Sequence, residues 1–249
     1  MTRPPSLHHA AVERIAGWIV GGRCGPGAFL PTEVEIGAEL GVSRTVVREA
    51  MRTLVAKGMV VVRRRHGTQV TPRERWSLFD AQVLDWRLKL GPDDAFIEDL
   101  IAFRLGVEPF AASLAAGNPD FPVERLEAAW TRMVRATEGE GEWHPADLAF
   151  HETILLGAGN QFLGSLAPMI VNTLRVSFSL SVLSLEDARA SLPAHRAVAD
   201  AIIARNPVAA RDRLIEVIRV AREEIFTRRH PEAGPAADPA REKARAASR

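Results

Sequence analysis

The chain lacks the cysteines that a disulfide-stabilised fold needs. Cys24 is the only cysteine among its 249 residues, so no intrachain disulfide can form, and a reducing compartment suits the protein. No apolar run approaches the roughly 20 residues of a membrane span, and the N-terminus has no signal-peptide core. The sequence therefore predicts a cytoplasmic protein with no membrane partner.

The chain also lacks a strong overall charge, because 32 basic side chains nearly balance 31 acidic ones. The two signs are distributed unevenly. Residues 1–75 hold 12 Lys and Arg against 6 Asp and Glu, whereas residues 76–230 hold 16 against 22. A basic N-terminal module joined to a larger acidic one indicates that only the first meets a polyanion.

Residues 30–70 carry the order of elements that is typical of a winged helix-turn-helix. A short amphipathic run ends at Gly41, where the chain must turn, and Ser43 stands at the N-cap position of the next helix. That helix, residues 44–57, has apolar side chains at helical spacing. Short β-type runs lie on either side of the basic segment 63–67. The pattern predicts a second helix sized for the major groove of double-stranded DNA and a basic hairpin beside it.

The rest of the chain reads as helices. From residue 80 to about residue 229 the segments have helical periodicity, and Gly, Pro and Asn separate them. The predicted helices span residues 80–90, 94–116, 122–138, 145–157, 161–184, 187–204 and 207–229. We therefore expect a mostly α protein with a winged helix-turn-helix domain over residues 1–71, a linker over 72–79, an all-helical bundle over 80–230 and a disordered tail over 231–249.

Four polar residues of the predicted bundle could carry chemistry. Asp147 and His151 are spaced i, i+4 on one helix, and His195 lies in the apolar pattern of a later helix. A carboxylate and two imidazoles that converge would hold Zn, Ni or Mn, although a lone buried histidine is more often a satisfied core residue. Arg104 interrupts an apolar stretch and needs an anion, which is either Glu108 one turn on or an effector carboxylate.

The chain resembles the GntR-type transcription regulators, and its helical half resembles the FCD ligand-binding domain of their FadR-like branch. The resemblance covers nearly all of residues 9–229. It rests on the segments LPTEVEIGAELGVSRTVVREAM, IEDLIAFRLGVEPFAASLAA, DLAFHETILLGAGNQFL and HRAVADAI. The segment WSLFDAQVLDWRL further resembles members that sense sugar acids.

The resemblance implies which residues contact an operator. Two arginines four residues apart, Arg44 and Arg48, place guanidinium forks on one helix face, where each suits guanine O6 and N7. Members of the family usually have an arginine where this chain has Val34, so one operator contact is absent. The DNA-binding residues expected from the resemblance and from the wing are Ser43, Arg44, Thr45, Arg48, Arg64, His66 and Gly67.

The resemblance also implies a ligand set. Asp147, His151 and His195 fall on the family's metal positions, whereas the position of its third histidine is occupied by Val217. Arg104 falls on a position that binds an effector carboxylate. The predicted helix 161–184 adds two further effector-binding residues, Asn172 and Arg175.

These observations predict a homodimeric repressor of a catabolic operon, released from DNA by a small carboxylate metabolite such as a sugar acid. Three alternatives stay open. The regulator could bind its effector without a metal. The 2-His-1-carboxylate set could belong to an enzyme that activates oxygen on Fe(II). The helical half could serve dimerisation alone, in a DNA-binding architectural protein.

Overall fold

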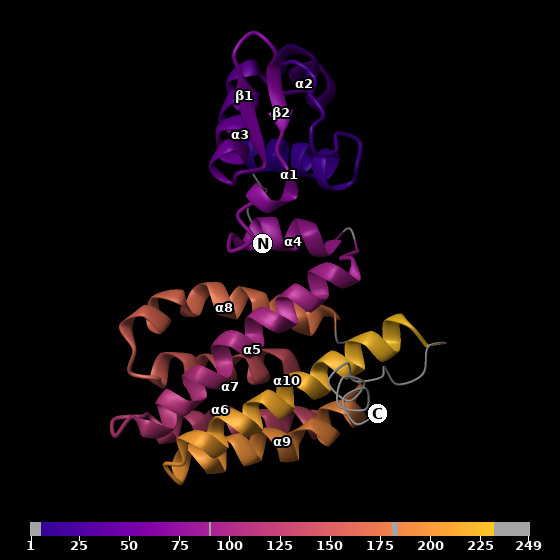
Figure 1. The fold of residues 1–249 in the computed structure, drawn as a ribbon. Helices are drawn as coiled ribbons and strands as arrows, with labels where there is room; N and C mark the ends of the chain where they lie inside the picture. Colours follow the sequence, from indigo (N-terminus) through magenta and orange to yellow (C-terminus); the bar gives the residue numbers. More distant parts are fainter. Residues whose placement is uncertain (1–5, 90, 181–183, 232–249) are drawn as a thin grey trace, which may run out of the picture. The chain divides into compact units, whose positions relative to one another are not determined.

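The computed structural model describes residues 6–89, 91–180 and 184–231, in two compact units divided between Asp93 and Asp94 (Figure 1). The first unit contains α1 (Leu7–Val20), α2 (Glu33–Leu40), α3 (Arg44–Ala56), β1 (Val60–Arg63), β2 (Gly67–Val70), the short 3₁₀ helix η1 (Arg73–Arg75) and α4 (Ala81–Lys89). The second contains α5 (Asp94–Gly117), α6 (Val123–Thr137), α7 (Trp143–Gly157), α8 (Gln161–Leu180), α9 (Leu185–Ile203) and α10 (Pro207–Arg229). The predicted fold class is confirmed.

Local signals define the ends of α2 and α3. The Thr32 hydroxyl accepts from the backbone N–H of Glu35, and the Glu35 carboxylate accepts from the Thr32 backbone N–H at 2.8 Å. Helix α2 ends where Gly41 adopts a φ of 66°, a conformation that costs glycine little. The Ser43 hydroxyl then accepts from the Val46 backbone N–H, so Ser43 is the N-cap of α3 as the sequence predicts.

One face of α3 is anchored in the core of the first unit. Its buried residues are Val47, Ala50, Met51 and Leu54. Because these positions recur every three or four residues, they lie on one side of the helix, and the polar residues of its first turn stay in water.

The strands β1 and β2 pair antiparallel and form the wing. Val60 pairs with Val70 at the buried base, and Arg63 pairs with Gly67 at the exposed tip. The turn between the strands has a positive φ at Arg65 (67°) and at Gly67 (99°). At Gly67 the absence of a Cβ makes this conformation inexpensive.

Helix α4 belongs to the first unit, so the predicted boundary at residue 80 is too early. Val83 and Trp86 are buried in the core of that unit, and the Trp86 indole N–H donates to Glu13 of α1 at 2.9 Å. Within the predicted linker 72–79, Trp76 is buried in the same core. Periodicity identified the helix but could not tell which core its apolar face would meet.

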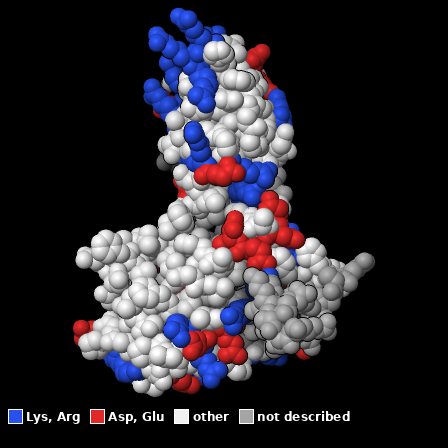
Figure 2. All heavy atoms as spheres, viewed as in Figure 1, with Lys and Arg blue, Asp and Glu red and all other residues white. Residues whose placement is uncertain are grey.

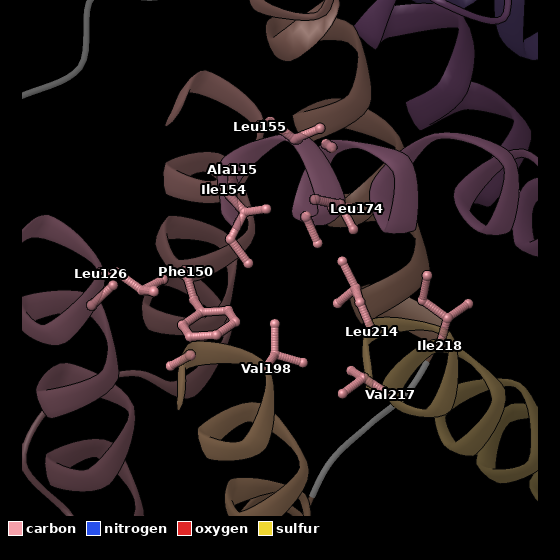
Figure 3. Close-up of a cluster of buried hydrophobic side chains, with 14 of the residues drawn as sticks. Ala115, Leu126, Phe150, Ile154, Leu155, Leu174, Val198, Leu214, Val217 and Ile218 are labelled. Carbon is pink, nitrogen blue, oxygen red and sulfur yellow. The ribbon is translucent and has the colours of Figure 1, made fainter. Parts of the chain in front are cut away.

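The second unit is a helical bundle in which α10 packs against α5 and α9, and α7 packs against α6 and α8. Phe150 of α7, Val198 of α9 and Leu214 of α10 lie together in its interior (Figure 3). Helices α7 and α9 therefore turn their inner faces toward the same space, and this positions the site described below.

The ends of the predicted helices agree with the bundle to within a few residues. The predicted helix 161–184 corresponds to α8, which ends at Leu180, and residues 181–183 lie outside the described part. The predicted tail 231–249 also lies outside it, apart from Pro231.

Contrary to the sequence expectation, α5 is long and apolar enough to cross a membrane by length and composition. Half of the most apolar 18-residue stretch of α5 is buried inside the bundle, and Arg104 and Glu108 are buried along the helix. A helix in the core of a bundle can have the same length and apolar composition as a membrane-spanning helix.

Candidate DNA interface and ligand site

The first turn of α3 presents polar side chains to solvent. Ser43, Arg44, Thr45 and Arg48 are all exposed. Within the described residues, neither Arg44 nor Arg48 forms an ion pair, whereas Arg52 on the same helix lies 2.6 Å from Glu49. Two unengaged guanidinium groups one helical turn apart can approach base edges or phosphates without breaking an internal contact.

The tip of the wing is basic and exposed. Arg64, Arg65 and His66 lie in the turn, and the His66 ring nitrogen Nδ1 lies 2.9 Å from the Arg64 carbonyl oxygen. Figure 2 shows Lys and Arg gathered over the end of the first unit that carries this turn. Arg65, which was not among the expected contacts, is exposed in the same turn. Val34, at the position where the resemblance implies an arginine, is half exposed at the start of α2.

In the second unit, Asp147 and His151 of α7 meet His195 of α9. Asp147 Oδ1 lies 3.4 Å from His151 Nε2 and 3.1 Å from His195 Nε2. All three residues are buried, and one ligand atom from each lies within 4.8 Å of the others. The i, i+4 spacing on α7 and the packing of α9 thus converge as the sequence suggested.

The opposite ring nitrogens of both histidines meet acceptors. His151 Nδ1 lies 2.8 Å from Glu108 Oε2, and His195 Nδ1 lies 3.0 Å from the Ser191 carbonyl oxygen. This is how metal-ligating imidazoles are usually oriented, with the second nitrogen donating to a carboxylate or carbonyl.

The inner atoms fit a divalent cation. Asp147 Oδ1 and His195 Nε2 are buried and lie 3.1 Å apart, but within the described residues neither atom has a partner with hydrogen-bond geometry. Ligand bonds of about 2.0–2.1 Å in a tetrahedral site place neighbouring ligand atoms about 3.3 Å apart. Asp147 Oδ1 lies 3.4 and 3.1 Å from the two histidine nitrogens, and all three ligand atoms lie within 4.8 Å of one another. Val217 lies beside this set with no donor atom, so the protein supplies one carboxylate and two imidazoles.

Charge within the cluster is strongly coupled. Burial by itself would raise the pKa of Glu108, but the charge of Arg104 and the contact with His151 lower it to about 2. The pKa of Asp147 is likewise lowered, because both histidines outweigh its burial. Burial would lower the pKa of His151, yet Asp147 and Glu108 raise it to about 9. Without a metal, His151 is therefore a cation between two carboxylates.

Arg104 is buried and paired with Glu108. Its Nε lies 2.7 Å from Glu108 Oε1, and its Nη1 donates to the Ser177 hydroxyl at 2.9 Å. Of the two anion partners left open by the sequence, the structure contains the internal one. Arg104 also lines the cavity described next, so its charge acts there as well.

A cavity of about 130 Å³ adjoins the cluster. Its walls include the three candidate metal ligands, Arg104 and Val217, together with two residues that were not expected, Trp143 and Glu224. The pKa of Glu224 is raised, chiefly by burial and next by the charge of Asp187. Glu224 lies seven residues after Val217, two turns along the same face of α10, which was the available sequence signal.

Two predicted effector residues do not reach this cavity. Arg175 is exposed on α8, and Asn172 is half-buried without lining the cavity. From α8 the described cavity is lined by Phe178 instead, and the assignment of Asn172 and Arg175 to an effector stays a prediction. Helical spacing could not tell which face of α8 would turn inward.

Comparisons with known proteins agree with both halves of the chain. Residues 7–70 match the family described as bacterial regulatory proteins, gntR family, and residues 99–220 match the FCD domain. In Escherichia coli strain K12, the uncharacterized HTH-type transcriptional regulator YieP is 36% identical over 202 residues, 80% of this chain and 86% of that protein. The galactonate operon transcriptional repressor of the same strain is 32% identical over 186 residues, 74% and 81% of the two chains.

A solved structure, described as Lar, which controls the expression of the Listeria monocytogenes agr system, shares the fold. Its TM-score is 0.64 at 17% identity, with 90% of this chain and 99% of that chain covered. The matched family and the two relatives in Escherichia coli are transcription regulators and not enzymes, so the alternative of an Fe(II) enzyme is wrong.

Proposed function

This chain belongs to the GntR family of bacterial regulatory proteins, and we propose that it represses a catabolic operon until a small carboxylate binds in its helical unit. The observation that carries the proposal is the buried cluster of Asp147, His151 and His195 beside a cavity. This cluster would let the second unit bind a small molecule while the first unit binds DNA. The relative that represses the galactonate operon supports a catabolic role.

On the operator, Arg44 and Arg48 would read base edges in the major groove, because both are exposed and unengaged on α3. Ser43 and Thr45 would contact phosphates or base edges near the start of that helix. The wing residues, with Arg64 foremost, would add phosphate contacts that hold any sequence equally. The valine at position 34 would remove one contact, so the preferred operator would differ from that of relatives with an arginine there.

Assembly as a homodimer is part of the proposal. A single recognition helix reads few bases, and regulators with this motif recover specificity by placing two copies on two half-sites. We expect a palindromic operator, with half-sites about one helical turn apart or a multiple of it.

In the helical unit, Asp147, His151 and His195 would hold a divalent ion, Zn, Ni or Mn. When bound, such an ion acts as a Lewis acid that attracts a carboxylate oxygen. Three protein ligands leave at least one position open for water or effector. Because Glu108 already engages Arg104, that arginine would favour an anion in the cavity chiefly by its charge. Small carboxylates, sugar acids among them, are the proposed effector class.

The metal-independent alternative has its own support. With a pKa of about 9, His151 forms ion pairs to Asp147 and Glu108 that satisfy the cluster partly without any metal. The protonated imidazole would then attract the effector carboxylate by its charge, and His195 would contact the effector through its Nε2.

A thermal-shift screen of small carboxylates, with and without divalent metals, tests the proposal, since a ligand of the native state alone raises its stability. Carboxylates that stabilise the protein are then tested for release of an operator duplex. Stabilisation without loss of operator affinity would favour the architectural alternative, and a metal-free preparation that responds fully would favour the metal-independent one.

A further inference from the structure

An unpartnered donor lies in a wall of the cavity. The indole N–H of Trp143 is buried and has no hydrogen-bond partner among the described residues, and the side chain lines the cavity beside His195. A buried N–H that donates to nothing is costly, so such a group usually serves a ligand or a water molecule. An acceptor atom inside the cavity would satisfy it.

The wall formed by α10 carries one acid. Val217, Val220, Ala221 and Glu224 face the cavity from this helix, and the first three are apolar. Glu224 forms no ion pair with a described residue, and the nearby Arg228 pairs with Asp187 at 2.5 Å. A half-buried carboxylate on an apolar wall accepts a hydrogen bond from a ligand and repels a ligand's second negative charge.

The size of the cavity restricts its contents. A volume of about 130 Å³ equals about four water molecules in the liquid, which is room for an acid of two or three carbons. Arg104, which is paired with Glu108, and the carboxylate of Glu224 act in opposite directions on an α-ammonium group, so the choice between an ammonium and a neutral hydroxyl beside Glu224 is left to the test.

We propose that Trp143 and Glu224 select the effector, and that this effector is a short 2-hydroxycarboxylate. The Trp143 N–H donates to an effector oxygen, and the Glu224 carboxylate accepts from the effector hydroxyl. This inference rests on the proposed function, because it assumes that a small carboxylate binds in this cavity.

The test measures the affinity of the full-length protein for four matched acids: lactate, propionate, alanine and tartronate. Wild type should bind lactate better than propionate, which lacks the hydroxyl, and better than tartronate, which adds a second carboxylate. Alanine carries an ammonium group where lactate has the hydroxyl, so a site that selects a hydroxyl should bind alanine more weakly. Trp143→Phe keeps an aromatic ring but removes the donor, so lactate should bind about 10-fold more weakly or worse. Trp130→Phe, at a half-buried tryptophan outside the cavity, is the matched control and should bind lactate as wild type does.

Two changes at Glu224 separate hydrogen bonding from charge. Glu224→Ala should lower the affinity for lactate to that for propionate. Glu224→Gln keeps an acceptor but removes the charge, so tartronate should gain about 10-fold while lactate changes little. The same changes at the exposed neighbour Glu223 should have no effect. Operator binding without acid shows that each variant is folded.

If Trp143→Phe does not fold, a nuclear magnetic resonance measurement on wild type takes the place of the variant. The indole N–H resonance of Trp143 should then shift when lactate is added. This resonance is assigned by replacing the other tryptophans singly, namely Trp18, Trp76, Trp86 and Trp130. The inference is overturned, and the proposed function stays intact, if wild type binds lactate while the variants keep the same affinities and the Trp143 resonance does not shift. Preference for alanine or tartronate overturns the effector class, and a wild type that binds no carboxylate overturns both.

Discussion

Glu108 is the residue at which the buried network can be tested most directly. Its carboxylate lies 2.7 Å from Arg104 Nε and 2.8 Å from His151 Nδ1, and it is almost completely buried. Glu108→Gln keeps the shape of the side chain and removes its charge. Arg104 and His151 would then remain as buried cations without their shared anion.

The expected loss follows from the pKa of Glu108. A fall from 4.5 to about 2 corresponds to about 3 kcal/mol of stability at neutral pH, similar to the 3–5 kcal/mol typical of a broken buried pair. In a unit of this size that loss lowers the melting temperature by about 6–12 °C. Because the folded pKa is depressed, the contribution is complete above pH 4.5 and is lost as the pH falls toward 2.

Thermal unfolding of the metal-free protein, followed by circular dichroism, measures the effect. Glu98→Gln is the matched control, because Glu98 also lies on α5 and pairs with an arginine, Arg222, but is 45% exposed. It should cost less than about 1 kcal/mol. Metal affinity is a second readout and should fall about 10- to 100-fold in Glu108→Gln, since Glu108 orients His151. If both variants melt as wild type does, Glu108 does not hold the charged network described here.

The other predictions concern DNA and metal. Arg48→Ala should cost about 1–3 kcal/mol of specific operator binding in fluorescence titrations. Arg52→Ala should cost less, since Arg52 pairs with Glu49, and equal losses would contradict the assignment of α3 as the helix that reads bases. Arg64→Ala should weaken operator and random duplex alike and reduce the salt slope by about one, and a loss confined to the operator would contradict a phosphate contact. Val217→His should slow metal loss to a chelator, and unchanged retention would show that this position does not reach the ion. Metal binding must remove the proton that His151 holds up to about pH 9. Metal affinity, measured by calorimetry, should therefore rise about tenfold per pH unit from pH 7 to pH 9, and an affinity that does not change with pH would contradict the raised pKa.

The DNA-binding half was predictable because its signals are local. Gly41 and Ser43 lie within a few residues of the turn that they define, and the spacing of Arg44 and Arg48 places both on one helix face whatever the helix packs against. The same holds for Asp147 and His151 on α7. For His195 and Val217, the resemblance supplied what spacing could not, since each lies on a different helix.

The tertiary structure decided which helix faces share an environment. Periodicity identified α4 and α8 as helices, yet only packing shows that Trp86 of α4 lies in the core of the first unit and that Arg175 of α8 points to solvent. Packing also brought Trp143 and Glu224, about 80 positions apart in the chain, to one cavity. A helix sequence determines which side chains share a face, but the neighbour of that face depends on how the other helices fill the core, and this is a property of the whole fold.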